Sequence, residues 1–168
     1  MKISELMANF TPSATYEGIV TADDMVFAIN NTENGEVGDY IVAEQSITGI
    51  EAQLNPMTVD STYIRAGQST TKTGTQRQIT VTGDKYIGDD FIDLCLSPSM
   101  MYGIGSNAVV DYVLFNILNG KGEKGKMCVI VNNDSAGSAG ENSTISIEFR
   151  KFGQDPLAYT YTPPVENP

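Results

Sequence analysis

The sequence contains no histidine and no tryptophan among its 168 residues. Without histidine, neither a Ser-His-Asp triad nor a Cys-His pair can form, so two common kinds of nucleophilic catalysis are excluded. Zinc sites usually need histidine or clustered cysteines, and the two cysteines here, Cys95 and Cys128, are isolated. We therefore expect no metal and no cofactor. Both cysteines have apolar neighbours and are interpreted as small buried residues in a reducing compartment, with a disulfide between them as the alternative.

Basic residues are also scarce: the chain has 10 Lys and Arg and 21 Asp and Glu, which gives a formal net charge of −11. Gripping nucleic acid through its phosphates needs clustered Lys and Arg, so such a chain can at most surround nucleic acid without holding it. No apolar run approaches the roughly 18 residues that span a bilayer. The first residues, "MKISELMANFTPS", lack the apolar core of a signal peptide. We expect no membrane association.

Alternating apolar and polar residues are the main structural signal. They occur in residues 76–86 and 143–151, and this pattern is typical of a strand with one face on the core and one on water. The inward-facing residues are predicted to be Ile79, Val81, Ile145 and Ile147. The water-facing residues are predicted to be Gln78, Thr80, Thr82, Ser146 and Glu148. Further strands are predicted within 19–29, over 40–54 with a bulge at Gly49, and at 127–131.

Residues 109–118 are apolar on both faces, with Val113 and Phe115 on one of them. Such a strand must be covered on both sides. Between residues 88 and 103 the period changes, because Phe91, Leu94 and Cys95 recur at the helical spacing i, i+3, i+4. We expect a helix over residues 89–96, capped by Asp89 or Asp90, to cover one face of that strand. Pro98 either ends this helix or starts a second short turn at Ser97.

The predicted fold class is mainly β: an antiparallel sandwich or distorted barrel flanked by one α-helix. Residues 1–18 are interpreted as an N-terminal arm, residues 19–155 as the β domain with its helix near 89–102, and residues 156–168 as an extended, Pro-rich tail. A polar loop, "YIRAGQSTTKTGT" (63–75), separates two apolar stretches. Loops of this length are uncommon and usually functional.

The motifs with possible chemistry have simpler structural explanations. "GKGEKGK" (120–126) matches GxGxxG, but a strand follows it where dinucleotide binding needs a helix, so it is predicted to be a hairpin turn. Asp89, Asp90 and Asp93 fit helix capping, and the spacing of a calcium loop is absent. Ser106 in "GIGSNA" has no histidine to activate it. No catalytic constellation remains, and we expect that the protein is not an enzyme.

Two long stretches resemble one known family. "YIRAGQSTTKTGTQRQITVTGDKYIGDDF" (63–91) and "YVLFNILNGKGEKGKMCVIVNNDSAGSAGEN" (112–142) are similar to the major tail tube protein of tailed bacteriophages and related prophages, over about residues 21–161. The resemblance implies a β-sandwich or barrel with one helix. It further implies hexameric rings that stack into a hollow tube through which genomic DNA passes, with an electronegative lining and with a long loop and terminal arms that bridge rings.

The resemblance also implies roles for particular residues. Ring stacking would involve Ile64, Arg65, Gln68, Lys72 and Thr75. The lumen would be lined by Glu44, Gln78, Thr80, Thr82, Ser146 and Glu148. The core would contain Ile79, Val81, Phe91, Leu94, Val113, Phe115, Ile145 and Ile147. Arg77 and Arg150 lie on the same candidate strands and would put positive charge in the channel unless Glu51 and Glu148 pair with them across strands.

The implied partners are further copies of the chain, the tape measure, baseplate or distal tail and terminator proteins, and passing DNA bound without sequence specificity. The implied location is the tail of the virion, assembled in the cytoplasm of a bacterial host. The alternative is a non-catalytic β-sandwich binding module, for carbohydrate or a host surface. Such sites favour exposed aromatic residues, above all tryptophan, which this chain lacks.

Overall fold

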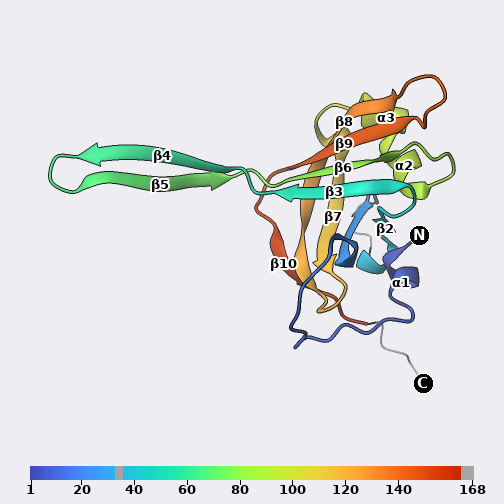
Figure 1. Cartoon of the computed structure of the whole chain (residues 1–168), viewed down its shortest axis with the longest axis horizontal. Helices are drawn as coiled ribbons and strands as arrows, with labels where there is room; N and C mark the ends of the chain where they lie inside the picture. The colour runs from blue at the N-terminus through green and yellow to red at the C-terminus, as the bar shows by residue number, and fades with distance from the viewer. Residues whose placement is uncertain (33–35, 164–168) are drawn as a thin grey trace.

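One curled antiparallel sheet forms most of the protein in the computed structural model, which describes residues 1–32 and 36–163 (Figure 1). Its main path runs β2-β1-β7-β8-β9-β6-β3, and β10 pairs with β8 beside it. The mainly β, antiparallel fold class predicted from the sequence is therefore confirmed. The strands are β1 (Met25–Asn30), β2 (Ile41–Val42), β3 (Ile47–Gln53), β6 (Gln78–Asp84), β7 (Val109–Asn116), β8 (Lys121–Ala136), β9 (Thr144–Lys151) and β10 (Leu157–Thr160).

The sheet curls because β8 changes partners along its 16 residues. Its first half pairs with β7 on one edge and with β10 on the other. From Met127 to Ala136 its partner is β9, with register shifts at Asn133. Register shifts of this kind bend a strand and increase its twist. The result is a half-barrel with an inner apolar face.

Helices α2 (Asp90–Cys95) and α3 (Pro98–Met101) cover this inner face. Asp89 caps α2, because its Oδ1 accepts hydrogen bonds from the backbone N–H groups of Phe91 at 2.7 Å and Ile92 at 3.3 Å. Ser97 is the N-cap of α3, so Pro98 starts a second helical turn. Both features follow the sequence prediction. Cys95, the last residue of α2, is buried and Cys128 is half-buried, and both are free thiols.

The inner core centres on an aromatic cluster. The ring of Phe91 lies 6.1 Å from the rings of Phe27 and Phe149, centroid to centroid, and Phe27 meets Phe149 edge-on at 5.0 Å. Seven of the eight predicted core residues are buried, whereas Leu94 is half-buried at the margin of this cluster. The buried seven are Ile79, Val81, Phe91, Val113, Phe115, Ile145 and Ile147.

The other face of β7 carries a second core, built by the two ends of the chain. Helix α1 (Ile3–Leu6) packs Ile3 and Met7, both buried, against Val113 and Phe115. From the C-terminal side, the ring of Tyr161 stacks on Phe115 at 6.0 Å, and β10 adds Tyr159 at 5.7 Å. The strand is thus covered on both faces, as its composition requires.

The terminal segments are therefore more structured than the sequence suggested. Residues 1–7 and 157–161 belong to the folded body, and an arm-like segment remains only over residues 8–20, most of which are exposed. Ile3, Leu6 and Met7 have the helical spacing i, i+3, i+4, which was the available signal. Residues 164–168 of the expected tail lie outside the described part of the chain.

Residues 56–75 differ most from prediction. They form a two-stranded hairpin, β4 (Pro56–Tyr63) and β5 (Gly67–Thr75), where the sequence suggested a turn and a long loop (Figure 1). The loop itself is only residues 64–66, followed by Gly67 at φ +73°. A short connection ending in a left-handed glycine is a common hairpin closure. The predicted strand at 40–54 is likewise two strands, separated at residues 43–46, and the bulge near Gly49 is present.

The first prediction concerns the aromatic cluster. Replacing Phe91 with alanine removes a fully buried ring, so the free energy of unfolding should fall by about 3–5 kcal/mol in urea denaturation. Phe152→Ala is the matched control, because that ring is 44% exposed and its loss should cost clearly less. Equal effects of the two substitutions would show that α2 does not dock on the sheet as described.

Candidate functional site

A polar face of four adjacent strands, β3-β6-β9-β8, carries most of the predicted channel residues. Cross-strand register pairs Gln78 with Arg150, Thr80 with Glu148 and Thr82 with Ser146. Residues paired across antiparallel strands share a face, and alternation places Ile79, Val81, Ile145 and Ile147 on the opposite, buried one. We call this surface the four-strand face. Glu44 is exposed but lies in the connection at residues 43–46, outside these strands.

The four-strand face carries an ion pair and a carboxylate that contacts an amide. Arg150 forms an ion pair with Glu148, and Asn132 Nδ2 donates to the other carboxylate oxygen of Glu148 at 3.3 Å. Hydrogen bonding from Arg150 lowers the pKa of Glu148, assisted by Asn132 and opposed by partial burial. Glu51, opposite Thr80, accepts from Gln53 Nε2 at 2.6 Å.

Arg77 and Arg150, the two arginines that could put positive charge on this face, have different ion-pair partners. Arg150 is neutralised by Glu148, which is a neighbour along the same strand, β9, and not a partner across strands. Arg77 points away from the face and pairs with Glu123, Nε to Oε1 at 2.6 Å. Sequence reasoning missed Glu123, because it belongs to a Gly- and Lys-rich segment that was interpreted as a turn.

Two backbone edges border the four-strand face. On one side, β3 pairs only with β6 among the residues that the structure describes. On the other side, β8 leaves β7 after Cys128, and within the described residues its continuation towards Ala136 pairs only with β9. Open strand edges present unpaired N–H and C=O groups and are templates for pairing with another chain.

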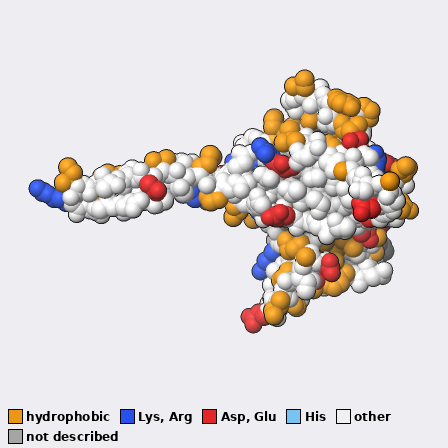
Figure 2. Space-filling model, turned by 45° about the horizontal axis from the view of Figure 1, so that its top comes forward, with side chains coloured by type: hydrophobic (Ala, Val, Ile, Leu, Met, Phe, Trp, Pro, Cys, Tyr) orange, Lys and Arg blue, Asp and Glu red, His pale blue; other side chains and the backbone are white. Residues whose placement is uncertain are grey.

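The β4–β5 hairpin, which we call the arm, stands away from the body as a narrow rod with basic atoms at its far end (Figure 2). Ile64 and Arg65 form its tip, and the Ile64 side chain is fully exposed. Of the other predicted stacking residues, Gln68 and Lys72 are exposed along β5, whereas Thr75 is half-buried at the root. Apolar side chains also lie open on the arm, namely Met57, Val59 and Tyr63, and Leu54 is exposed just before it. An isolated two-stranded ribbon is only marginally stable, so the arm gains from contact with another surface.

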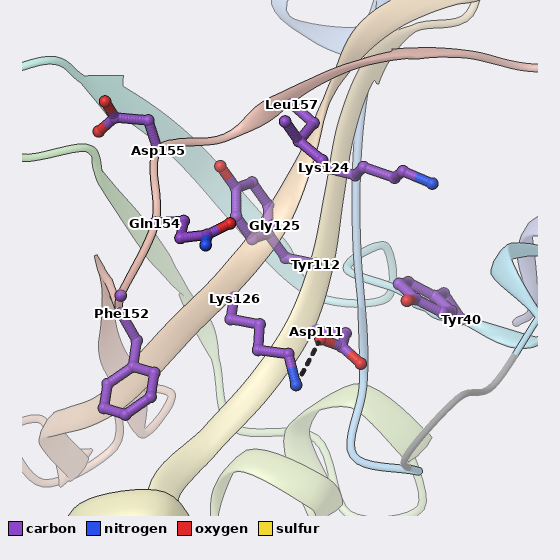
Figure 3. Close-up of a pocket in the computed structure, with 11 residues that line it drawn as sticks. Tyr40, Asp111, Tyr112, Lys124, Gly125, Lys126, Phe152, Gln154, Asp155 and Leu157 are labelled. Atoms are coloured by element: carbon purple, nitrogen blue, oxygen red, sulfur yellow. Dashed lines mark ion pairs between the residues drawn. The ribbon is translucent and has the colours of Figure 1, made fainter.

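A cavity of about 510 Å³ lies between β7, β8 and the segment leading to β10 (Figure 3). Its two carboxylates are held by lysines, Asp111 by Lys126 at 3.7 Å and Asp155 by Lys151 at 2.6 Å. Burial, with the charge of Asp111, raises the pKa of Tyr40 to about 12, so its hydroxyl stays protonated at neutral pH. The residues lining the cavity therefore pair no nucleophile with a free base.

Two searches of the described residues bear on other functions. Over residues 1–32 and 36–163, no group of three or more His, Cys, Asp or Glu side chains is placed to hold a metal ion. No helix in the same part of the chain has the length and apolar character needed to cross a membrane.

Several solved structures have a similar fold. A chain from the tail of an empty gene transfer agent particle, refined with C6 symmetry, matches with a TM-score of 0.59 at 15% identity, over 86% of this chain and 100% of that one. A chain from the virion of a native gene transfer agent matches with a TM-score of 0.55 at 12% identity, over 86% and 100%. A chain from the PVC sheath-tube complex of an extracellular contractile injection system, in its extended state, matches with a TM-score of 0.53 at 6% identity, over 94% and 97%.

No protein-family model matches the chain, and no curated protein matches it in sequence. The chain therefore shares the fold of proteins from tails and injection particles along almost its whole length. The similarity to tail proteins indicated by residues 63–91 and 112–142 is confirmed at the level of the fold.

The pair on the four-strand face makes the second prediction. Because the pKa of Glu148 is lowered in the folded state, its ion pair adds stability above the unfolded pKa of about 4.3, and this contribution is lost as pH falls through the lowered value. Glu148→Gln should therefore be less stable than the original protein at pH 7, and the difference should shrink below about pH 4. Glu51→Gln on the same face is the control. A difference that stays constant in urea unfolding from pH 7 to pH 3 would contradict this assignment.

Proposed function

We propose that this chain is the structural subunit of a tail tube, in which copies join edge to edge in six-membered rings and the rings stack into a hollow conduit for DNA. The observation that carries the proposal is the match to a tail chain of a particle with C6 symmetry, which covers the whole of that chain. The neighbours belong to particles and injection devices, which supports a structural role over a catalytic one.

The two open edges explain how copies would join. Three successive antiparallel pairings make β3 and β8 run in opposite directions. Rotation about a ring axis preserves strand direction relative to that axis, so β3 of one copy would meet β8 of the next in antiparallel orientation. That is the pairing already used throughout the sheet. Each copy would add four strands, and closing the ring would remove both open edges.

The four-strand face would then line the channel. Gln78, Thr80, Thr82 and Ser146 offer it uncharged polar groups, and Glu148 engages the positive charge of Arg150. DNA phosphates bind where free Lys or Arg side chains cluster, and this face provides no such cluster. DNA would therefore pass without adhering. Glu44 would line the channel only if its connection turns towards the lumen in the ring.

The arm would bridge successive rings. Its tip residues Ile64 and Arg65 would meet the adjacent ring, as would Gln68 and Lys72 along β5, while Thr75 would support the root. Burying the exposed apolar side chains of the arm would offset the cost of holding it against a neighbour. Identical contacts repeated around a closed ring add together, so each of them can be weak.

The remaining partners follow from this role. A tube of finite length needs proteins that set its length and close its ends, which we identify with the tape measure, distal tail or baseplate, and terminator proteins. The protein would be located in the virion tail after assembly in the host cytoplasm. A non-catalytic binding module remains the alternative, and it predicts a monomer at all concentrations.

Removing the arm provides the third prediction. Replacing residues 57–74 by a Gly-Ser dipeptide should leave the free energy of unfolding within about 0.5 kcal/mol, because both cores lie outside the arm. Negative-stain microscopy should show tubes for the original protein but at most isolated rings for the shortened one. Tubes formed without the arm would show that the arm is not the bridge between rings.

A charge-reversal variant refines the same test. Arg65→Glu with Lys72→Glu should shorten tubes more at low salt than at high salt, because exposed charge pairs are screened. Lys121→Glu with Lys124→Glu is the matched control, since it changes the net charge equally on exposed residues of β8. Equal effects of the two double variants would point to overall repulsion and not to contacts of the arm.

The proposed ring joint provides the fourth prediction. Cysteines at Glu51 in β3 and at Asn132 or Asp134 in β8, with Cys128 replaced by serine, should form disulfides between copies, because neighbouring strands bring Cα atoms within bonding range. Oxidised tubes should then give a ladder of covalent oligomers on a denaturing gel. Glu51→Cys with Lys121→Cys should give none, because β10 pairs with β8 at Lys121. A ladder from the control alone would refute the β3–β8 joint.

A further inference from the structure

The arm is attached to the body by two short links, residues 54–55 and 76–77, which connect it to β3 and β6. The links are joined to each other by a hydrogen bond from the Gln76 N–H to the Asn55 carbonyl at 3.3 Å. Asn55 has a φ of +40°, and its Nδ2 donates to Gln78 Oε1 at 3.0 Å. The ladder of β3 with β6 therefore ends at a defined point, and the two links separate it from the ladder of the arm.

Arg77 is the residue in these links that reaches into the body. Its side chain is only 12% exposed. Its Nε donates to Glu123 Oε1 at 2.6 Å, and its Nη1 donates to the Gln53 carbonyl at 3.4 Å. Its own carbonyl accepts from the Lys151 N–H at 2.8 Å. One residue thus connects the second link of the arm with the end of β3, with β8 and with β9.

The far end of this connection is fixed in the core. Glu123 Oε1 also accepts a hydrogen bond from the Tyr112 hydroxyl at 3.1 Å, and Tyr112 is 1% exposed. The buried Tyr112 therefore fixes the carboxylate of Glu123, and this carboxylate in turn fixes the guanidinium of Arg77 in the second link. Because Arg77 and Glu123 are largely shielded from water, salt screens their attraction less than that of an exposed pair.

We infer that Arg77 is the positioning residue of the arm, and that its contacts with Glu123 and Gln53 hold the arm at one angle to the sheet. Arginine suits this task because its planar fork can donate to two acceptors at once, whereas lysine offers a single charged point. An arm held before assembly loses less conformational freedom on contact. This consequence for stacking rests on the proposed function; the positioning itself does not.

The inference can be tested in the unassembled protein. Spin labels on Ile64→Cys at the arm tip and Thr82→Cys on β6, with Cys128 replaced by serine, report the angle of the arm through a distance distribution measured by pulsed electron paramagnetic resonance. Both sites are exposed, and the remaining Cys95 is buried. The protein is measured at concentrations where it elutes as a monomer, so that only distances within one chain contribute.

We expect one narrow distribution with Arg77 present and at least a twofold broader one in Arg77→Met, which keeps the apolar stem but cannot donate. Arg77→Lys should fall between them. Arg150→Met is the matched control, because it removes an arginine–glutamate pair from the four-strand face and should leave the distribution narrow. If Arg77→Met does not fold, Glu123→Gln serves instead, since the amide oxygen can still accept from Tyr112 but loses the charge.

The outcomes separate this inference from the proposed function. A distribution in Arg77→Met, or in Glu123→Gln where that variant is needed, as narrow as the original and at the same mean overturns the inference, whatever happens to tubes. Broadening with loss of tubes supports both. Broadening with unchanged tubes supports the positioning role and counts against the arm as the bridge between rings.

Discussion

The backbone pairing of β8 is the constraint on which the rest of the molecule depends. The first half of this strand pairs with β7 and β10, and its second half pairs with β9, so the sheet must curl. The curled sheet encloses the inner core beneath α2 and α3. The same change of partners leaves the carboxyl-terminal half of β8 with one open edge. A fold that satisfied both edges here would bury its core equally well but would have no means of adding another copy. The proposed assembly thus pairs the backbone N–H and C=O groups that pairing within one copy leaves free.

The parts of the structure that local pattern governs were predictable. Alternation placed Ile79, Val81, Ile145 and Ile147 in the core, and the acidic cap with helical spacing located α2, because each signal depends on neighbours within a few residues. The prediction of a loop was wrong for the arm because β5 is polar on both faces and carries no alternation, and because Ser61 interrupts the alternation of Met57, Val59 and Tyr63 in β4. Alternation also placed the predicted polar residues of β6 and β9 on one face. Glu44 is not on this face, because the predicted strand is interrupted at residues 43–46.

Long-range contacts account for what could not be predicted. The docking of α1 and of the segment from β10 to Tyr161 in one cluster with Phe115 joins the two ends of the chain, and no local pattern specifies that meeting. The Arg77–Glu123–Tyr112 connection likewise joins residues 35 to 46 positions apart or on neighbouring strands, and Glu123 lies in a segment whose glycines indicate a turn. The register of β8 against β7 brings Glu123 to Tyr112, and the pairings of β6 with β9 and of β9 with β8 bring Arg77 to Glu123, so this part of the site follows from the fold.

Most of the acidic residues of the chain do not lie on the candidate channel surface. The chain has a net charge of −11, yet the paired rows of the four-strand face carry only Glu51, Glu148 and Arg150, with Asp84 at the end of β6, and Glu148 and Arg150 cancel. In a ring, the remaining Glu51 would recur in every copy at one height along the axis. A closed circle of like charges in a narrow space focuses its field more than scattered surface charges do. A weakly charged face can therefore give a repulsive channel once it is repeated by symmetry, while the arginine that would attract phosphate is already occupied by Glu148.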